Sequence, residues 1–146
     1  MTTEPTTEPR VITARLLAQA DAFTRGYVVE ELWLSVDDTS AEYDPASGFG
    51  PSLARTAGES NIDPETLRAV IDECADFVAM NRADLDATGD DDDDLGADFA
   101  LSRNGHGTGF WDRGYGAVGD RLHAAAKVYG ATYWYVDDET GRIVRA

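Results

Sequence analysis

Cysteine is almost absent from this chain, and the sequence contains no long apolar run. The single cysteine, Cys74, excludes an intrachain disulfide and suits a reducing compartment. Its place in an apolar stripe predicts a small buried hydrophobe rather than a nucleophile. No stretch approaches the roughly 20 apolar residues of a transmembrane helix, and the polar, acidic start of the chain is unlike a signal peptide. We therefore expect a cytoplasmic protein that makes no membrane contact.

Positive charge is also scarce. Twelve Lys and Arg residues stand against 28 Asp and Glu residues, which gives a net charge of −16. Residues 1–98 hold 23 acidic and six basic residues, whereas residues 99–146 hold five acidic and six basic residues. The electric field of such a negatively charged chain repels phosphate backbones, which argues against direct nucleic-acid binding. It favours basic proteins or cations as partners.

Motifs for metals and cofactors are missing or incomplete. The two histidines, His106 and His123, are not spaced as zinc ligands, and no cysteine pair accompanies them. Residues 114–119 match the dinucleotide pattern G-x-G-x-x-G, in which a helix N-terminus holds a pyrophosphate. That match begins 33 residues before the end of the chain, which leaves no room for the remaining parallel strands. We expect neither a metal nor a cofactor.

What the sequence does contain is the composition of a folded protein, with 42% hydrophobic and 10% aromatic residues. Residues 1–10 are polar and proline-punctuated, which predicts a disordered tail. Residues 11–146 are expected to form a single domain. Within it, apolar residues at a period near 3.6 predict a helix over residues 11–36.

The clearest helix start signal comes after a long connector. The connector, residues 38–62, is rich in glycine and proline and is expected to be mobile. Asp63 is a good N-cap, and Pro64 fits the first helical position. These residues predict a second helix over residues 64–87 that stops at Gly89.

The second half of the chain reads as a small sheet with one helix. An acidic loop at residues 88–97 precedes two short strands joined by a tight turn at Asn104–Gly105, a preferred pair for hairpins. The predicted order is strands at 98–103 and 108–112, a helix at 118–129, and strands at 131–136 and 142–145. The prediction is an α+β fold, with two N-terminal helices followed by a ββαββ unit and a small antiparallel sheet.

Aromatic rings concentrate in this second half. If alternate strand residues face opposite sides, Phe110, Tyr133 and Tyr135 share one side, and Trp111 and Trp134 the other. One side then packs under the helices, and the other is an exposed aromatic patch of the kind that marks a binding surface. The residues predicted to form this site are Arg103, Asn104, His106, Phe110, Trp111, Asp112, Arg113 and Trp134.

The five-aspartate run Asp90–Asp94 has two interpretations. It fails as a calcium loop because Leu95 replaces the required glycine and Leu101 replaces the bidentate glutamate. A solvated linker kept open by its own charge is the simpler interpretation. The alternative is a surface that mimics the phosphate backbone of DNA and binds a basic protein.

The stretch around His106 resembles a known family. Arg-Asn-Gly-His-Gly at 103–107 and Gly-Phe-Trp-Asp-Arg at 109–113 are similar to the hallmark of a small protein that recurs in tailed-phage and prophage genomes. That hallmark reads Asp-Phe-Trp-Leu-Thr-Arg-Asn-Gly-His-Gly-Ala-Gly-Phe-Trp-Asp. Here Ala100, Ser102 and Thr108 replace its Trp, Thr and Ala. The similarity extends over roughly residues 64–140. It implies a phage origin and the host cytoplasm, and no particular chemistry.

The expected function is therefore that of a small acidic phage accessory protein that binds a host or phage protein. One alternative is a DNA-mimic inhibitor of a host defence or DNA-processing protein. The other is a nucleotide-binding or hydrolytic module in which His106 and Asp112 perform acid–base chemistry. No activated nucleophile accompanies that pair, so a non-enzymatic role is favoured.

Overall fold

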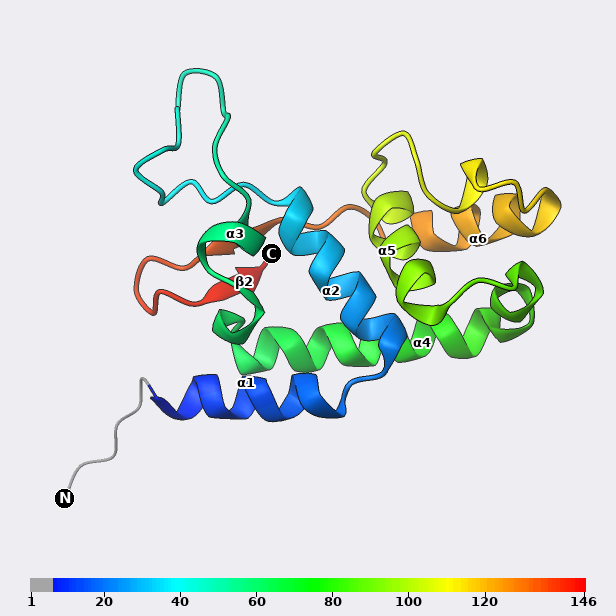
Figure 1. The fold of residues 1–146 in the computed structure, drawn as a ribbon, viewed down its shortest axis with the longest axis horizontal. Helices are drawn as coiled ribbons and strands as arrows, with labels where there is room; N and C mark the ends of the chain where they lie inside the picture. Colours follow the sequence, from blue (N-terminus) through cyan, green and yellow to red (C-terminus); the bar gives the residue numbers. More distant parts are fainter. Residues whose placement is uncertain (1–6) are drawn as a thin grey trace.

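The computed structural model describes residues 7–146, and helices dominate it (Figure 1). Within this range the chain forms six α-helices, two short 3-10 helices and one two-stranded antiparallel sheet. The predicted α+β fold with a ββαββ unit is therefore wrong. No helix of the described part has both the length and the apolar character to cross a membrane.

The predicted helix over residues 11–36 is two helices. Helix α1 spans Thr7–Gln19 and α2 spans Ala22–Leu34. Asp21 separates them because its carboxylate accepts a hydrogen bond from Thr24 N at 2.8 Å and caps α2. Of the predicted tail, residues 1–6 lie outside the described residues, whereas residues 7–10 form the start of α1.

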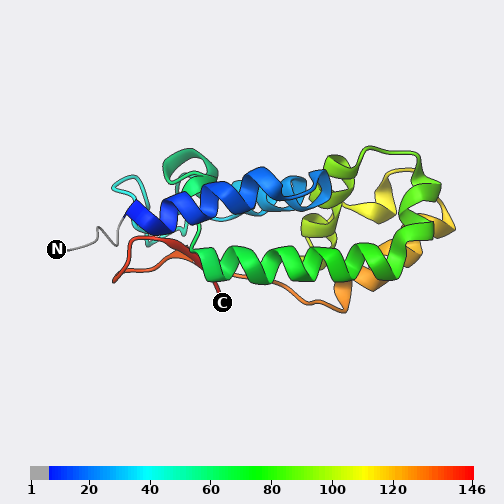
Figure 2. The same cartoon turned by 90° about the horizontal axis from the view of Figure 1, so that it is seen from below.

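Helix α4, Pro64–Thr88, confirms the sequence prediction closely. Asp63 accepts hydrogen bonds from the backbone amides of Glu65 and Thr66, and Gly89 ends the helix with a φ of 73°. This left-handed conformation favours glycine, which explains the stop. Figures 1 and 2 show α4 running alongside α1, with α1 and α2 in one layer and α4 in the other.

Helix α5, Asp92–Arg103, replaces most of the predicted acidic loop at 88–97 and the whole predicted strand at 98–103, so that only residues 89–91 connect α4 to α5. Asp92, Asp93 and Asp94 form its first turn, where negative side chains are stabilised by the positive end of the helix dipole. Its buried side includes Leu95, Phe99 and Arg103, a spacing of four residues that fits a helix. The acidic run therefore begins a helix instead of keeping a loop open.

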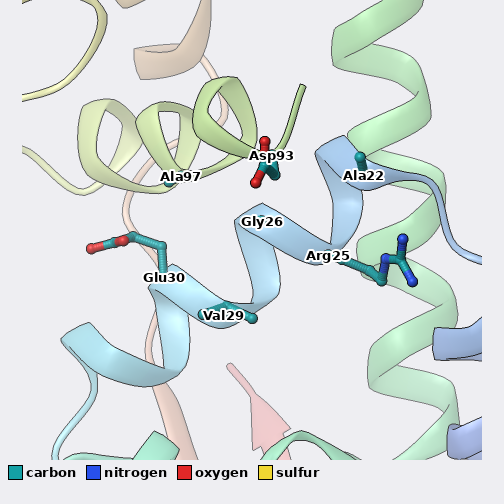
Figure 3. A pocket seen from close by; sticks show the side chains of 7 residues that line it. All are labelled: Ala22, Arg25, Gly26, Val29, Glu30, Asp93 and Ala97. Carbon is teal, nitrogen blue, oxygen red and sulfur yellow. The ribbon is translucent and has the colours of Figure 1, made fainter. Parts of the chain in front are cut away.

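Helices α2 and α5 cross at two glycines. A Cβ on Gly96 would lie 1.9 Å from the carbonyl oxygen of Phe23, and a Cβ on Gly26 would lie 2.0 Å from that of Asp93. Figure 3 shows Gly26 facing the backbone at Asp93. Only residues without a side chain allow the two backbones to approach this closely.

The segment after α5 turns back to form the rest of the core. The predicted strand at 108–112 is a 3-10 helix, η2, Phe110–Asp112, in which the Asp112 carboxylate accepts from Gly109 N at 3.0 Å. Helix α6, Ala117–Lys127, confirms the helix predicted near 118–129. Figure 1 shows α5 between α2 and α6.

The chain ends in the predicted hairpin, although its strands are shorter than expected. Strand β1, Trp134–Val136, pairs antiparallel with β2, Ile143–Arg145, and Val136 lies opposite Ile143. A parallel bridge joins Ile62 to Ile143 and ties the hairpin to the start of α4.

Aromatic rings from four helical elements meet in the core. Phe77 of α4 stacks on Phe99 of α5 at 4.2 Å between ring centroids, and Phe23 of α2 and Phe110 of η2 flank the pair. Cys74 is fully buried beside them, as predicted. Burial raises the pKa of its thiol, which keeps it protonated and unreactive.

The connector at 38–62 contains more structure than the sequence suggests. It holds helix α3, Leu53–Thr56, and the 3-10 helix η1, Glu59–Asn61. Asp37 anchors its start by accepting hydrogen bonds from Thr39 N at 2.9 Å and from Thr56 Oγ1 at 2.7 Å. Burial raises the pKa of Asp37, but these hydrogen bonds outweigh it and hold the pKa below its ordinary value.

Replacing Asp37 with alanine is therefore expected to loosen the connector. Amide hydrogen exchange should quicken about tenfold or more across residues 38–52, because the donors of Thr39 and Thr56 lose their shared acceptor. Exchange in α4 should stay unchanged. Asp38→Ala is the matched control because that neighbouring side chain is exposed. Equal exchange in the two variants would show that Asp37 does not hold this segment.

Candidate functional site

An open hollow of about 400 Å³ brings together three of the eight predicted site residues. We call it the aromatic hollow. Asn104 and His106, at the end of α5, and Trp134 of β1 line one part of it, and the start of the connector lines the other. Its lining residues are Leu34, Ser35, Val36, Asp38, Tyr43, Gly48, Asn104, His106, Ala131, Thr132, Tyr133 and Trp134.

Tyrosine rings line the aromatic hollow. Tyr133 is 59% exposed and stacks on Tyr135, with 5.4 Å between the ring centroids. Tyr43, a half-buried ring of the connector, lines it as well. His106 is exposed on the glycine-flanked turn after α5. Large exposed rings around a concavity are the usual form of a protein-binding surface.

A buried glutamate holds the floor of the aromatic hollow together. Glu31 of α2 accepts hydrogen bonds from Asn104 Nδ2 at 3.0 Å, Thr132 Oγ1 at 2.9 Å and the Tyr27 hydroxyl. Asn104 Oδ1 in turn accepts from Thr132 N at 2.7 Å. Burial, and then the charge of Glu31, raise the pKa of Tyr27 well above its ordinary value, so the phenol remains a donor. Asn104 thus shapes the floor and has few groups left for a ligand.

Arg103, predicted as a contact residue, is instead buried beneath that floor. Its Nε donates to Gly130 O at 2.8 Å and its Nη2 to Tyr129 O at 2.9 Å. Its Nη1 pairs with Glu73, which also binds Arg145 at 2.7 Å. This guanidinium joins α5 to α4 and to the segment before β1, which is a structural role.

Three of the predicted aromatic contacts divide between interior and surface. Phe110 and Trp134 are both buried. The predicted strand alternation is wrong for Phe110, which lies in the 3-10 helix η2. Around β1 the alternation is confirmed, because Tyr133 stacks on Tyr135 while Trp134 between them is buried. Trp134 Nε1 is buried and, within the described part of the chain, has no hydrogen-bond partner. Trp111 is 46% exposed and stands edge-on to the His123 ring, 6.3 Å away. Trp111 is not among the residues that line the aromatic hollow.

Asp112 stabilises the local backbone, and Arg113 forms an ion pair with α5. Asp112 accepts from Gly109 N and from Thr108 Oγ1, and the bond from Gly109 holds the pKa of Asp112 below its ordinary value. Arg113 pairs with buried Asp98 at 2.9 Å. Among residues 7–146 no hydrogen bond joins His106 to Asp112, whose carboxylate accepts from Gly109 and Thr108 instead.

A second, acidic hollow of about 350 Å³ lies around Arg113. Glu30 of α2 and Asp90, Asp94 and Asp98 line it with that arginine. Burial, and then the charge of Asp98, raise the pKa of Glu30. Sequence reasoning missed Glu30 because its partners lie some sixty to eighty residues away along the chain.

Sequence reasoning also missed the contribution of the connector to the aromatic hollow. Tyr43 is a large ring in an otherwise glycine-, proline- and acid-rich stretch, and that contrast was the available signal. Comparisons of the chain with protein-family models, with curated proteins and with solved structures found no match. The interpretation of the aromatic hollow therefore depends on its own geometry and charge.

Proposed function

We propose that this chain is a small acidic phage accessory protein that binds a basic protein of the host or of the phage through the aromatic hollow. The observation that carries the proposal is the concavity itself, which is lined by the exposed ring of Tyr133 and by the ring of Tyr43. Exposed aromatic residues supply large contact areas at low entropic cost, and they are enriched among the residues that dominate binding energy.

Charge supports a basic partner. A net charge of −16 attracts cationic surfaces and accelerates their encounter, whereas it repels nucleic acids. The phage origin and the host cytoplasm are supported by the resemblance around His106. In this proposal the acidic surface steers the partner, and the aromatic hollow holds it.

Asp91, Asp93 and Asp94 favour a second candidate, the DNA mimic. These exposed carboxylates gather within 4.8 Å of one another at the start of α5. A basic DNA-binding protein would contact this cluster in place of phosphates. The cluster also stabilises the N-terminus of α5, which accounts for its position without any partner.

Quantitative affinity capture from host lysate separates the two candidates. Tyr133→Ser with Tyr43→Ser should reduce recovery of a specific partner at least about tenfold, the loss that removal of two contact rings predicts. The triple change of Asp91, Asp93 and Asp94 to asparagine should reduce it only slightly. Trp111→Ala is the matched aromatic control, because Trp111 is exposed away from the aromatic hollow.

The reverse pattern would overturn the proposal in favour of mimicry. Loss in the triple asparagine variant, with full recovery in the ring variant, places the contact on α5. The enzyme alternative is checked by thermal shift of the wild-type chain with nucleotides at saturating concentration. Stabilisation that His106→Ala abolishes would support that alternative instead.

A further inference from the structure

Asn104 stands directly before a glycine, the arrangement in which an asparagine side chain reacts most readily with its own backbone. Deamidation begins when the backbone nitrogen of the next residue attacks the side-chain amide carbon, and glycine has no Cβ to obstruct that approach. The other two asparagines of the sequence, Asn61 and Asn81, precede isoleucine and arginine. Asn104 is therefore the asparagine whose intrinsic chemistry most favours deamidation.

The reaction consumes only water. The Gly105 nitrogen loses its proton and forms a bond to Asn104 Cγ, and the side-chain nitrogen leaves as ammonia. Water then opens the resulting five-membered succinimide ring, which yields aspartate or isoaspartate. Each product carries a carboxylate in place of the neutral amide, and isoaspartate also places the side-chain carbon in the backbone.

The fold occupies every polar position of the Asn104 side chain. Its Nδ2 donates to Glu31 Oε1 at 3.0 Å and to Ala100 O at 2.8 Å. Its Oδ1 accepts from Thr132 N at 2.7 Å and from Thr132 Oγ1 at 3.2 Å. A side-chain amide has two donor hydrogens and an oxygen with two lone pairs, so this one is saturated. It cannot rotate without breaking bonds to α2, to α5 and to the segment before β1.

The backbone at Asn104 is also turned away from ring closure. Asn104 is the C-cap of α5 and has a ψ of −3°, which places the Gly105 nitrogen beside the nitrogen of Asn104 and away from its Cβ. A succinimide requires a rotation about the Cα–C bond, because Cβ and the Gly105 nitrogen belong to the same small ring. That rotation breaks the hydrogen bonds from Gly105 N to Ser102 O and from His106 N to Leu101 O.

We propose that Asn104 is a deamidation site that the folded chain protects, and that its reaction irreversibly dismantles the floor of the aromatic hollow. In the product, a carboxylate oxygen takes the place of Nδ2 and faces the Glu31 carboxylate and Ala100 O. A donor shared by two acceptors thus becomes repulsion between like charges. Opening of the turn after α5 starts the change, and refolding cannot reverse it.

Deamidation rates in the folded and unfolded chain test the protection. Wild-type protein is incubated at mildly alkaline pH with and without urea, and peptide mass spectrometry follows the conversion of Asn104. Conversion should be at least about tenfold slower without urea, because the reaction must await local opening. Asn61 and Asn81 should keep their amides in both samples. Equal rates for Asn104 with and without urea would overturn the proposal.

A variant in urea isolates the intrinsic chemistry. Gly105→Ala should slow the conversion of Asn104 in the unfolded chain at least about tenfold, because a Cβ then obstructs the attacking nitrogen. This comparison requires no folded structure, so strain at Gly105 does not affect it. Equal rates would show that Gly105 is not the attacking residue.

Thr132→Val tests whether the hydrogen bonds of the floor protect the amide. Valine keeps the backbone donor of residue 132 but removes the hydroxyl that donates to Glu31 Oε2 at 2.9 Å. Conversion of Asn104 in the folded variant should rise about threefold or more. Thr140→Val, which removes a hydroxyl bonded to Asp137 in the turn between β1 and β2, should leave it unchanged. Circular dichroism establishes that both variants fold, and equal rates in the two would overturn protection by these bonds.

Asn104→Asp reproduces the charge of the product. Amide hydrogen exchange should quicken at least about tenfold at Thr132 and its neighbours, because the second carboxylate repels Glu31 from the floor. Asn61→Asp adds the same charge beside Arg10 at the surface and should leave that exchange unchanged. Unchanged exchange in Asn104→Asp would show that the floor tolerates the product, which contradicts the proposed loss. These measurements do not depend on any partner of the aromatic hollow.

Discussion

Replacement of Gly96 by alanine is expected to lower the free energy of unfolding by about 3 kcal/mol, the upper range for an overpacked core. The new Cβ would lie 1.9 Å from the carbonyl oxygen of Phe23 and 2.8 Å from Tyr27 N. Both contacts are to backbone atoms, so rotation of a side chain cannot relieve them. Helices α2 and α5 must separate, which opens the packing of Phe23 against Phe99.

The sign of this effect is informative. Glycine to alanine within a helix normally stabilises it by up to ~1 kcal/mol, so helix propensity predicts the opposite result. Urea denaturation followed by circular dichroism measures the difference. Ala97, the next residue on α5, lines the acidic hollow, so Ala97→Ser adds one heavy atom beside open space and should cost well under half as much. A Gly96→Ala variant as stable as the wild type would show that the helices cross less closely than described.

Local signals in the sequence predicted those parts of the fold whose cause is local. Asp63, Pro64 and Gly89 fix the two ends of α4 through capping and the left-handed turn, and both ends were predicted. The C-terminal hairpin follows from strand-forming residues on both sides of a polar turn, and it too was predicted. Each of these features is decided within a few residues of chain.

Helix α5 was not predicted because tertiary contacts determine that this segment is helical. Its acidic first turn resembles a solvated linker in sequence, and the alternation from Asp98 to Arg103 resembles a strand. The structure resolves the ambiguity through Gly96, whose backbone contact with α2 fixes a helix at that position. A contact between residues some seventy positions apart leaves no local pattern.

The sequence predicted some residues of the candidate site correctly, but it did not predict how the site is arranged. Asn104, His106 and Trp134 do converge at the aromatic hollow. Arg103 and Phe110, by contrast, are buried. Arg103 can be buried because two carbonyl oxygens and a carboxylate satisfy its guanidinium inside the protein. Phe110 packs against Phe77 in the core. Sequence shows that a side chain can bind something, but its burial depends on which elements pack over it.

Arg103 carries the second large predicted effect. Arg103→Met should destabilise the fold by about 3–5 kcal/mol, the usual cost of removing one partner from a buried ion pair. The change leaves the carbonyl oxygens of Tyr129 and Gly130 without their donors. It also removes the cation that lies 5.4 Å from the centre of the Phe99 ring. Methionine keeps most of the volume, so the loss reports on polar contacts more than on a cavity.

Arg68→Met provides the matched comparison, because Arg68 pairs with Glu65 at 2.8 Å on the exposed surface of α4. An exposed pair of this kind contributes at most about 1 kcal/mol, since water and salt screen it and the side chains lose entropy. A double-mutant cycle between Arg103→Met and Glu73→Gln should give a coupling of about 1–3 kcal/mol. Similar small losses for Arg103→Met and Arg68→Met would mean that the buried guanidinium is not what joins α5 to α4. The floor of the aromatic hollow would then depend on the hydrogen bonds of Glu31 with Asn104 and Thr132.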